Sequence, residues 1–546
     1  MDMERGARAT SYPEIGGRRA LWEGFVRSAQ RVAARPALIV EGRTYTYGEL
    51  QEAAYRIAAT LQRRPEFATP SLTAVFAYRS FSALSGVLGS LLAGNAYLPL
   101  NRTFPIERTK LMFEHSEALS IVVDEGSLPQ LETLLEAAHK PLLVILPEVG
   151  DVADLRLRWP VHTFVAGTLL EPAAHWREPV IEPNAMAYLL FTSGSTGVPK
   201  GVMVAHRNAL AFVNCMADRF EVSEHDRMSN MIEMTFDPSI FDMFVCWDRG
   251  ACLCCPSQRT LIKPGSFINE SRLTIWSAVP STAILMKQWG MLKPAQYPSL
   301  RVSVFQGEPF PVNIASAWAQ AAPNSILENH YGPTEVTVNC TYYRWDPTRT
   351  PQEAEQGIVP IGYPTPGMNV RVGDEFLNEV APGETGELLM SGPQVSLGYL
   401  NDPGKTAAAF VVPPGDEVIY YRTGDRVRRP VGSGPITHLG RIDFQIKIAG
   451  RRVELGEVEQ VVRETAMRDA VVAVGWPPTS TGYASVEVFI EGEARPREIE
   501  ALRSALSDRL PDYMVPRRFH FSSNLPRNTN GKVDRAALIK SLGENE

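Results

Sequence analysis

The chain has 546 residues, of which 44% are hydrophobic and 21% charged, and its formal net charge is −7 at pH 7. This composition is typical of a large soluble enzyme; no apolar stretch is long enough to cross a bilayer, and the mildly acidic balance gives no indication of nucleic-acid binding. Residues 1–17 are polar and lack the apolar segment of a secretory signal, so we expect a cytoplasmic protein.

Apolar runs that look like strands alternate with amphipathic segments along most of the chain, which favours an α/β architecture with a mainly parallel sheet. Residues 185–191 (AMAYLLF) are typical of a buried strand. Over residues 205–220, Leu210, Val213 and Met216 recur at helical spacing and predict a helix. We find no internal repeat or low-complexity tract.

Between this strand and this helix lies the sequence TSGSTGVPKG, residues 192–201. Glycines allow the backbone to turn N–H groups toward an anion, hydroxyls add donors, and the lysine adds a mobile positive charge. The spacing does not fit G-x-x-x-x-G-K-[ST], which argues against an ordinary P-loop NTPase. Taken alone, such a loop is more often a plain connection. In the order strand, loop, helix it is also consistent with a loop that wraps a nucleotide phosphate.

Three of the six cysteines, Cys252, Cys254 and Cys255, stand close together. No histidine or second cysteine pair lies at ligand spacing nearby, and residues 250–255 are typical of a buried strand that enters a turn at Pro256. We therefore expect core cysteines rather than a metal site.

The loop belongs to a series of short motifs in a fixed order. They are TYTYGEL (44–50), LAGNAYLPL (92–100), FDPS (236–239), NHYGPTE (329–335), GEL (386–388) with GYL (398–400), YRTGD (421–425), GRIDFQIK (440–447), LPDYMVP (510–516) and NGKVDR (530–535). With the loop, this series closely resembles the AMP-forming ligases, the superfamily of acyl-CoA synthetases, luciferases and the adenylation domains of nonribosomal peptide synthetases. The resemblance covers roughly residues 44 to 535.

The resemblance implies a domain organisation. It predicts a polar tail over residues 1–18, a large adenylate-forming (AMP-binding) domain with mainly parallel sheets over 19–442, and a small mobile α+β lid domain over 443–546, hinged at Asp443. In this family the small domain turns between an adenylating and a thioester-forming pose, so each half-reaction has its own active site.

The resemblance also implies ATP and Mg²⁺ as cofactors, because adenylation brings two anions together. Glu335 matches the carboxylate that holds Mg²⁺; the alternative is a helix-start glutamate favoured by the helix dipole. Tyr331 would stack on adenine unless it is a plain core tyrosine, and Asp425 would accept from the ribose hydroxyls unless it only caps a turn. Arg441 is similar to a nucleotide contact, whereas otherwise it would be a surface ion pair. The expected ATP-binding residues are Thr192, Ser193, Gly194, Ser195, Thr196, Gly197, Lys200, Gly307, Glu308, Asn329, His330, Tyr331, Gly332, Pro333, Thr334, Asp425, Arg441 and Lys532.

The expected catalytic residues are Lys532, Glu335 and Thr196. An isolated lysine on a turn near the C-terminus would normally be solvated and inert. The context NGKVDR of Lys532 nevertheless matches the family's catalytic lysine, which bridges the substrate carboxylate and the α-phosphate in the adenylating pose.

The expected substrate depends on Asp237. In adenylation domains that take α-amino acids, the aspartate at this position pairs with the substrate ammonium, whereas Asp237 followed by Pro238 is also a good helix N-cap. Bulky Phe241 and Gln306 predict a short pocket, suited to glycine, alanine, serine or proline. The pocket residues implied by the motifs are Phe236, Asp237, Pro238, Phe241, Ser277, Val304, Gln306, His330, Val338 and Asn339, closed by Lys532.

The expected acceptor is a separate carrier protein whose phosphopantetheine thiol attacks the aminoacyl adenylate. The chain ends soon after Lys532, and nothing like a condensation domain precedes Thr44, so we expect a stand-alone enzyme similar to aminoacyl-carrier-protein ligases. Lys447 and Gly450 lie in the loop that lines the thiol tunnel in this family. The alternatives are a coenzyme A ligase, a noncatalytic nucleotide-binding regulator, and a luciferase or oxidase.

Overall fold

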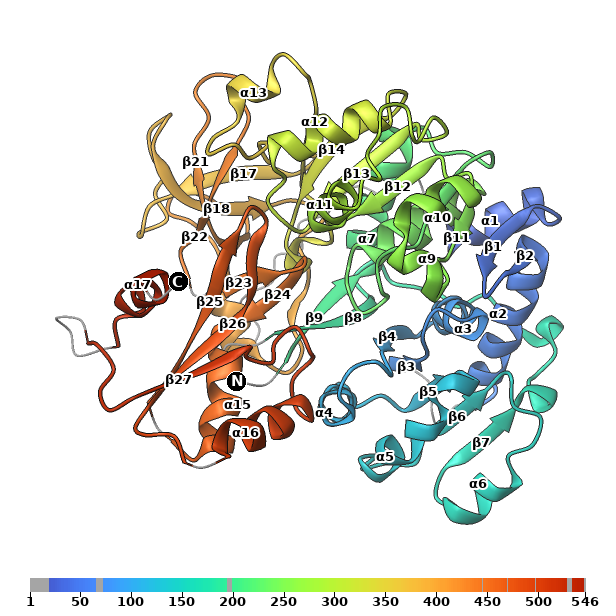
Figure 1. Ribbon diagram of the computed structural model, residues 1–546. Helices are drawn as coiled ribbons and strands as arrows, with labels where there is room; N and C mark the ends of the chain where they lie inside the picture. The colour runs from blue at the N-terminus through green and yellow to red at the C-terminus, as the bar shows by residue number, and fades with distance from the viewer. Residues whose placement is uncertain are drawn as a thin grey trace.

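The computed structural model describes residues 19–64, 72–193, 199–443, 445–468, 470–495, 497–527 and 533–544 (Figure 1). Its strands form two large, mostly parallel sheets, one smaller antiparallel sheet, and two small sheets near the C-terminus. The α/β architecture expected from the sequence is therefore confirmed, as is the small C-terminal α+β region.

The first large sheet has eight strands in the order β19-β9-β8-β4-β3-β5-β6-β7. Every residue of β3 to β6 is buried, as expected for parallel strands that are covered on both faces. The exceptions are at one edge, where β9 pairs antiparallel with both β8 and β19. The bounds are β3 Leu72–Phe76, β4 Ala96–Leu100, β5 Ser120–Val123, β6 Leu143–Leu146, β7 Thr163–Ala166, β8 Met186–Thr192, β9 Lys200–Ala205 and β19 Gly398–Tyr399.

The second large sheet has nine strands in the order β16-β15-β14-β13-β12-β10-β11-β1-β2. Its central strands are parallel, and β2, β15 and β16 pair antiparallel at the two edges. The bounds are β1 Pro36–Val40, β2 Arg43–Thr46, β10 Arg227–Ser229, β11 Cys252–Cys254, β12 Ile275–Ala278, β13 Val302–Gln306, β14 Ile326–Tyr331, β15 Thr341–Arg344 and β16 Tyr363–Pro364.

A third, antiparallel sheet follows in the chain. It consists of β17 Asn369–Gly373, β18 Thr385–Ser391, β20 Phe410–Val411, β21 Tyr420–Arg428 and β22 Thr437–Arg441. The C-terminal region then forms the hairpin β23 Gln445–Ile448 and β24 Arg451–Glu454, and a sheet of β25 Val471–Thr479, β26 Gly482–Glu491 and β27 Arg518–Ser522. This region has its own buried cluster, which includes Val458, Val488 and Leu506.

Helices cover both large sheets. Their bounds are α1 Glu23–Val32, α2 Tyr47–Gln62, α3 Phe81–Leu92, α4 Ile106–Ser116, α5 Leu131–Glu136, α6 Ala153–Arg158, α7 His206–Arg219, α8 Cys246–Arg249, α9 Gln258–Ile262, α10 Pro264–Glu270, α11 Pro280–Gln288, α12 Val312–Ala321, α13 Thr350–Glu353, α14 Pro403–Ala409, α15 Leu455–Ala466, α16 Glu498–Ser507 and α17 Arg535–Glu544. A π-helical turn, Phe241–Val245, leads into α8, and a 3₁₀ turn, Thr334–Val336, follows β14. Among the described residues, no helix combines the length and apolarity that crossing a bilayer requires.

Local sequence signals explain where several helices begin. Thr46 and Glu49 form a capping box at the start of α2, with N–H to side-chain distances of 2.8 and 3.2 Å. The Ser80 hydroxyl accepts from the Ala83 N–H at the start of α3. The helix predicted over residues 205–220 is α7, directly after β9.

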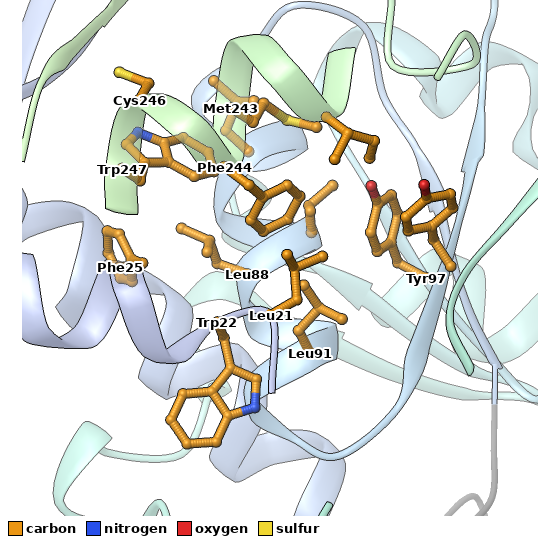
Figure 2. Packing of buried hydrophobic residues seen from close by; sticks show 14 of the residues in the cluster. Leu21, Trp22, Phe25, Leu88, Leu91, Tyr97, Met243, Phe244, Cys246 and Trp247 are labelled. Atoms are coloured by element: carbon orange, nitrogen blue, oxygen red, sulfur yellow. The ribbon is translucent and has the colours of Figure 1, made fainter. Parts of the chain in front are cut away.

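The two large sheets are joined by a continuous apolar layer (Figure 2). Phe25 of α1 and Phe244 of the π turn each lie 5.9 Å from the Trp247 ring, in edge contacts. Cys246 lies in the same cluster, and Cys252 and Cys254 are buried in the next one. The expectation that the clustered cysteines belong to the core is confirmed. This layer fixes the two sheets relative to each other and so fixes the cavity between them.

Candidate active site

A cavity of about 380 Å³ lies where the parallel strands end. Strands β12, β13 and β14 deliver Ala278, Gln306 and Tyr331 to its wall from one sheet, and β8 delivers Thr192 from the other. Ligand sites of α/β proteins lie at such carboxyl ends of parallel strands. The hairpin β23–β24 closes the opposite side, next to β9 (Figure 1).

Most of the site residues predicted from the sequence meet at this cavity. Those that line it are Thr192, Ser193, Phe236, Asp237, Pro238, Gln306, Gly307, Tyr331, Gly332, Pro333, Thr334, Val338, Asn339, Asp425, Arg441, Lys447 and Gly450. The predicted Gly194, Ser195, Thr196, Gly197 and Lys532 lie outside the described residues. The other predicted residues do not line it.

Asp237 presents a carboxylate to the cavity. Its Oδ2 atom is buried without a hydrogen-bond partner among the described residues, while the Thr334 hydroxyl bonds the carboxyl group. Burial, with a smaller contribution from the nearby Glu335 carboxylate, raises the pKa of Asp237 to about 7. The side chain does not cap the following π-helical turn, whose N-cap residue is Ile240 and which has no side-chain cap. The carboxylate is thus free for a cationic ligand group, which agrees better with the binding interpretation than with the capping one.

Beneath Asp237, a chain of hydrogen-bonded side chains forms the floor of the cavity. Gln306 is fully buried; its Nε2 donates to the Ser277 hydroxyl at 2.9 Å, and its Oε1 accepts from the Asn339 amide. Because both ends of the amide are bonded, the side chain is held across the base of the pocket.

Several predicted pocket residues support this floor from behind instead of lining the cavity. Phe241 and Val304 are fully buried, and Phe241 packs edge-on against Phe220 at 6.2 Å. His330 is bonded through Nε2 to Glu328 at 2.9 Å. The predicted Asn329 donates to the carbonyls of residues 359 and 360, so its amide hydrogens hold a loop.

A second polar group lies at the β21–β22 side of the cavity. The Tyr331 hydroxyl donates to Asp425 Oδ2 at 2.6 Å, and Asp425 Oδ1 contacts His438 at 3.0 Å and Arg441 at 3.1 Å. Burial opposes ionisation of Asp425, yet Arg441 and His438 hold its pKa below the ordinary value. Arg441 also forms a bidentate pair with Asp443 at 2.6 and 2.7 Å. This group can accept hydroxyl hydrogens from a ligand, as a ribose requires.

Three further predicted residues, Glu308, Lys447 and Gly450, lie around the turn of the hairpin. Glu308 Oε2 accepts from the Ser281 N–H at 2.7 Å at the start of α11, and burial raises the pKa of this carboxyl to about 7. Burial lowers the pKa of Lys447, which lines the cavity. Gly450 has a φ of +77°, a backbone conformation that glycine adopts without strain. A Cβ atom at this position would clash with the Val279 side chain.

Glu335, the predicted metal ligand, is fully buried and already surrounded by donors. Arg452 Nη1 lies 2.9 and 3.2 Å from its two oxygens, Tyr399 donates to Oε1 at 2.9 Å, and Lys200 Nζ lies 3.8 Å away. Burial opposes the charge, but Arg452 and Lys200 lower the pKa of Glu335 to about 2. The described residues contain no group of three histidine, cysteine, aspartate or glutamate side chains arranged to hold a metal. In this arrangement the residues at Glu335 do not fit a divalent cation.

Sequence reasoning missed a set of cavity residues from two helices and the hairpin. The additional lining residues include Phe104, Arg108 and Met112 at α4, Thr282 and Leu285 on α11, and Gln445, Ala449, Arg451, Arg452 and Tyr513 from the C-terminal region. Arg108 forms a buried ion pair with Glu457 of α15. The segment GRRVELGE, which begins at Gly450, was the available signal for Arg452, since it lies just after the GRIDFQIK motif.

Comparisons with known proteins agree with this geometry. Residues 25–400 match the family described as AMP-binding enzyme. A D-alanine–D-alanyl carrier protein ligase from Bacillus velezensis is 30% identical over 511 residues, which cover 91% of this chain and 94% of the ligase. Tyrocidine synthase 2 from Brevibacillus parabrevis is 32% identical over 523 residues, which cover 94% of this chain but 13% of the synthase.

Among solved structures, the adenylation domain AlmE from Vibrio cholerae, in complex with glycyl-adenosine-5′-phosphate, superposes with a TM-score of 0.84 at 31% identity. The superposition covers 99% of this chain and 100% of AlmE. The family match, which extends over more than half of the chain, and these relatives confirm the resemblance seen in the motifs. The chain belongs to the AMP-binding enzyme family and is an AMP-forming adenylating ligase, which implies the use of ATP.

Proposed function

We propose that the protein activates a small α-amino acid with ATP and transfers the aminoacyl group to the phosphopantetheine thiol of a separate carrier protein. The observation that carries the proposal is the buried Asp237 carboxylate, whose Oδ2 lacks a partner among the described residues, above the short floor formed by Gln306. An unpaired buried carboxylate is costly, and a substrate ammonium would compensate it.

Asp237 and Gln306 together define the substrate class. The ammonium pairs with Asp237, so the side chain of the amino acid points toward the Ser277–Gln306–Asn339 floor. Because this floor leaves little depth, glycine, alanine, serine and proline fit better than branched or aromatic amino acids. The activities in the names of two relatives, the D-alanine carrier ligase and the adenylation domain with glycyl-adenosine-5′-phosphate, support a small amino acid.

The first half-reaction joins the amino acid to AMP. A carboxylate oxygen of the substrate attacks the α-phosphorus of ATP, the bond from that phosphorus to the bridging oxygen breaks, and pyrophosphate leaves. In the proposal, Tyr331 stacks on adenine, Asp425 accepts from the ribose hydroxyls, and Arg441 contributes positive charge beside it. Lys532, with the hydroxyl loop around Thr196, would neutralise the reacting anions.

The second half-reaction forms the thioester. The thiol sulfur attacks the carbonyl carbon of the adenylate, the bond from that carbon to the phosphate oxygen breaks, and AMP leaves. Because Lys447 and Gly450 line the cavity and Arg452 contacts Glu335, we assign the described arrangement to this half-reaction. A domain boundary at Asp443 is part of the same proposal, with Lys532 brought to the cavity by rotation of residues 443–546.

ATP–pyrophosphate exchange tests the proposal directly. The acids compared are glycine, L- and D-alanine, the other proteinogenic amino acids, and several fatty and aryl acids. We expect strong exchange with one small amino acid, lost in Asp237→Asn, and transfer to a holo carrier protein. Exchange only with acids that lack an α-amine, insensitive to Asp237→Asn, would overturn the amino-acid assignment, and efficient transfer to free coenzyme A would identify a coenzyme A ligase.

A further inference from the structure

The carboxylate of Glu335 is contacted by two cations that come from different parts of the chain. Lys200, 3.8 Å away, belongs to β9 in the same sheet that flanks the cavity. Arg452, 2.9 Å away, belongs to the β23–β24 hairpin of the C-terminal region. With Tyr399 bonded to the same carboxylate, both oxygens have close donors.

We propose that Arg452 takes the place of a divalent cation at Glu335, so that docking of the hairpin and binding of the metal at this carboxylate exclude each other. The inference rests on the proposed function, because it requires a divalent cation to accompany ATP in the first half-reaction. The inference also gives Arg452 a role as a positioning residue in the second half-reaction.

Exclusion follows from the space and the charge around the carboxylate. Mg²⁺ binds oxygen ligands in a near-octahedral shell at about 2.0–2.1 Å and keeps several waters. That shell cannot form where a guanidinium nitrogen lies 2.9 and 3.2 Å from the two carboxylate oxygens. Two positive charges would also stand within a few ångströms of each other in a buried place, where repulsion is weakly screened.

Undocking of the hairpin in turn favours metal binding, because the Glu335 carboxylate needs a cation close to it at all times. The carboxylate is fully buried, and a buried charge without an opposite charge is strongly unfavourable. Lys200 lies on β9 and is available with the hairpin in or out, but at 3.8 Å it does not form a direct hydrogen bond. The exchangeable cation is therefore either the metal or Arg452.

Three further contacts hold the hairpin, and the helix α15 that follows it, in the docked position. The Ser193 hydroxyl donates to the Arg452 carbonyl at 3.1 Å, Lys200 lies 3.8 Å from Glu454, and Arg108 pairs with Glu457. Ser193 and Lys200 both belong to the segment TSGSTGVPKG, residues 192–201. Docking thus brings Arg452 to the metal position and closes the phosphate side of the cavity in one step.

The test measures Mn²⁺ binding to the full chain in the presence of AMP, followed by the electron paramagnetic resonance of free Mn²⁺. Four variants are compared with the wild type: Arg452→Ala, Arg452→Lys, Arg451→Ala and Glu335→Gln. Arg451 is the matched control, because it lies on the same hairpin but places its guanidinium over the Tyr513 ring at 4.7 Å, away from Glu335. Circular dichroism and thermal unfolding show whether each variant is folded.

We expect Arg452→Ala to bind Mn²⁺ about tenfold more tightly than the wild type, because the competing cation is gone. Arg452→Lys, which keeps a positive charge, and Arg451→Ala should stay within about twofold of the wild type, and Glu335→Gln should bind weakly. Unchanged affinity in Arg452→Ala, or full affinity in Glu335→Gln, would overturn the inference.

A second measurement takes its deciding result from the wild type and so does not depend on the folding of a variant, with Glu335→Gln as an additional control. Trypsin cleavage at Lys447 and Arg451 reports whether the hairpin is docked. With AMP present, added Mn²⁺ should accelerate this cleavage in the wild type and leave Glu335→Gln unaffected; equal rates with and without Mn²⁺ in the wild type would contradict the competition. Pyrophosphate exchange on the same samples tests the proposed function separately, because it can fail while the Mn²⁺ results hold.

Discussion

Replacing Asp237 with asparagine tests substrate recognition directly. The burial and the raised pKa of this carboxylate predict both how far kcat/KM falls and how kcat/KM depends on pH. In the free enzyme the pKa of Asp237 is raised to about 7 by burial. An ammonium pairs with the ionised carboxylate only. The ionised fraction rises from about 9% at pH 6 to about 91% at pH 8, so kcat/KM for the amino acid should rise about tenfold over this range.

The assay is pyrophosphate exchange at saturating ATP, with kcat/KM for the amino acid measured between pH 6 and pH 8. Loss of one partner of a buried charge pair costs about 3 kcal/mol, which corresponds to roughly a 150-fold fall in kcat/KM at pH 8. Asp237→Asn should show this fall and a flat pH profile. Glu233→Gln is the matched control: Glu233 lines the same cavity but is bonded to Asn101 at 2.8 Å, so its variant should keep the wild-type slope.

The raised pKa of Asp237 also predicts how the stability of the folded protein changes with pH. The folded pKa lies above the ordinary value of 3.8, so folding takes up protons and the stability present below pH 4 is lost as the pH rises to about 7. Without ligand, the melting temperature of Asp237→Asn relative to the wild type should therefore rise from pH 5 to about pH 7 and level off above it. A wild-type kcat/KM that is constant from pH 6 to pH 8, or a variant with the same slope, would refute the reasoning.

Three further predictions follow from the floor, the lysine and the core. Gln306→Ala should deepen the pocket and raise kcat/KM for valine relative to glycine by about tenfold, measured by pyrophosphate exchange; unchanged selectivity would show that Gln306 is not the floor. Lys532→Ala should abolish exchange but leave thioester formation from supplied adenylate within a few-fold, and equal losses in both steps would contradict its assignment to the first. Trp247→Ala should cost about 3–5 kcal/mol in denaturant unfolding, whereas the half-exposed Trp289→Ala should change stability by less than about 0.5 kcal/mol; similar effects of the two would exclude Trp247 as a core anchor.

Much of the fold could be predicted because its signals are local. Continuous apolar runs become the buried parallel strands β3 to β6, and helical spacing after the phosphate loop becomes α7. The motif series also predicts that Asp237, Gln306 and Asp425 belong to one site, and all three line the same cavity.

The rest depends on partners that are far apart in the chain. Whether Phe241 lines the pocket or supports it depends on Phe220, and His330 is bonded to Glu328, which also pairs with Arg219 and Arg344. The docking of Arg452 on Glu335, more than a hundred positions earlier, depends on how the C-terminal region is placed. No periodicity or spacing in the sequence encodes such a placement.

The burial of the cysteines makes this chain suited to thiol labelling. All six are free thiols, and Cys215 alone among them is not fully enclosed. Burial raises its pKa to about 11, so only about one molecule in ten thousand carries the reactive thiolate at pH 7. A cysteine introduced at an exposed position of the C-terminal region would react far faster than any native one. Single fluorophores would then test the proposed rotation of that region in the otherwise unmodified enzyme.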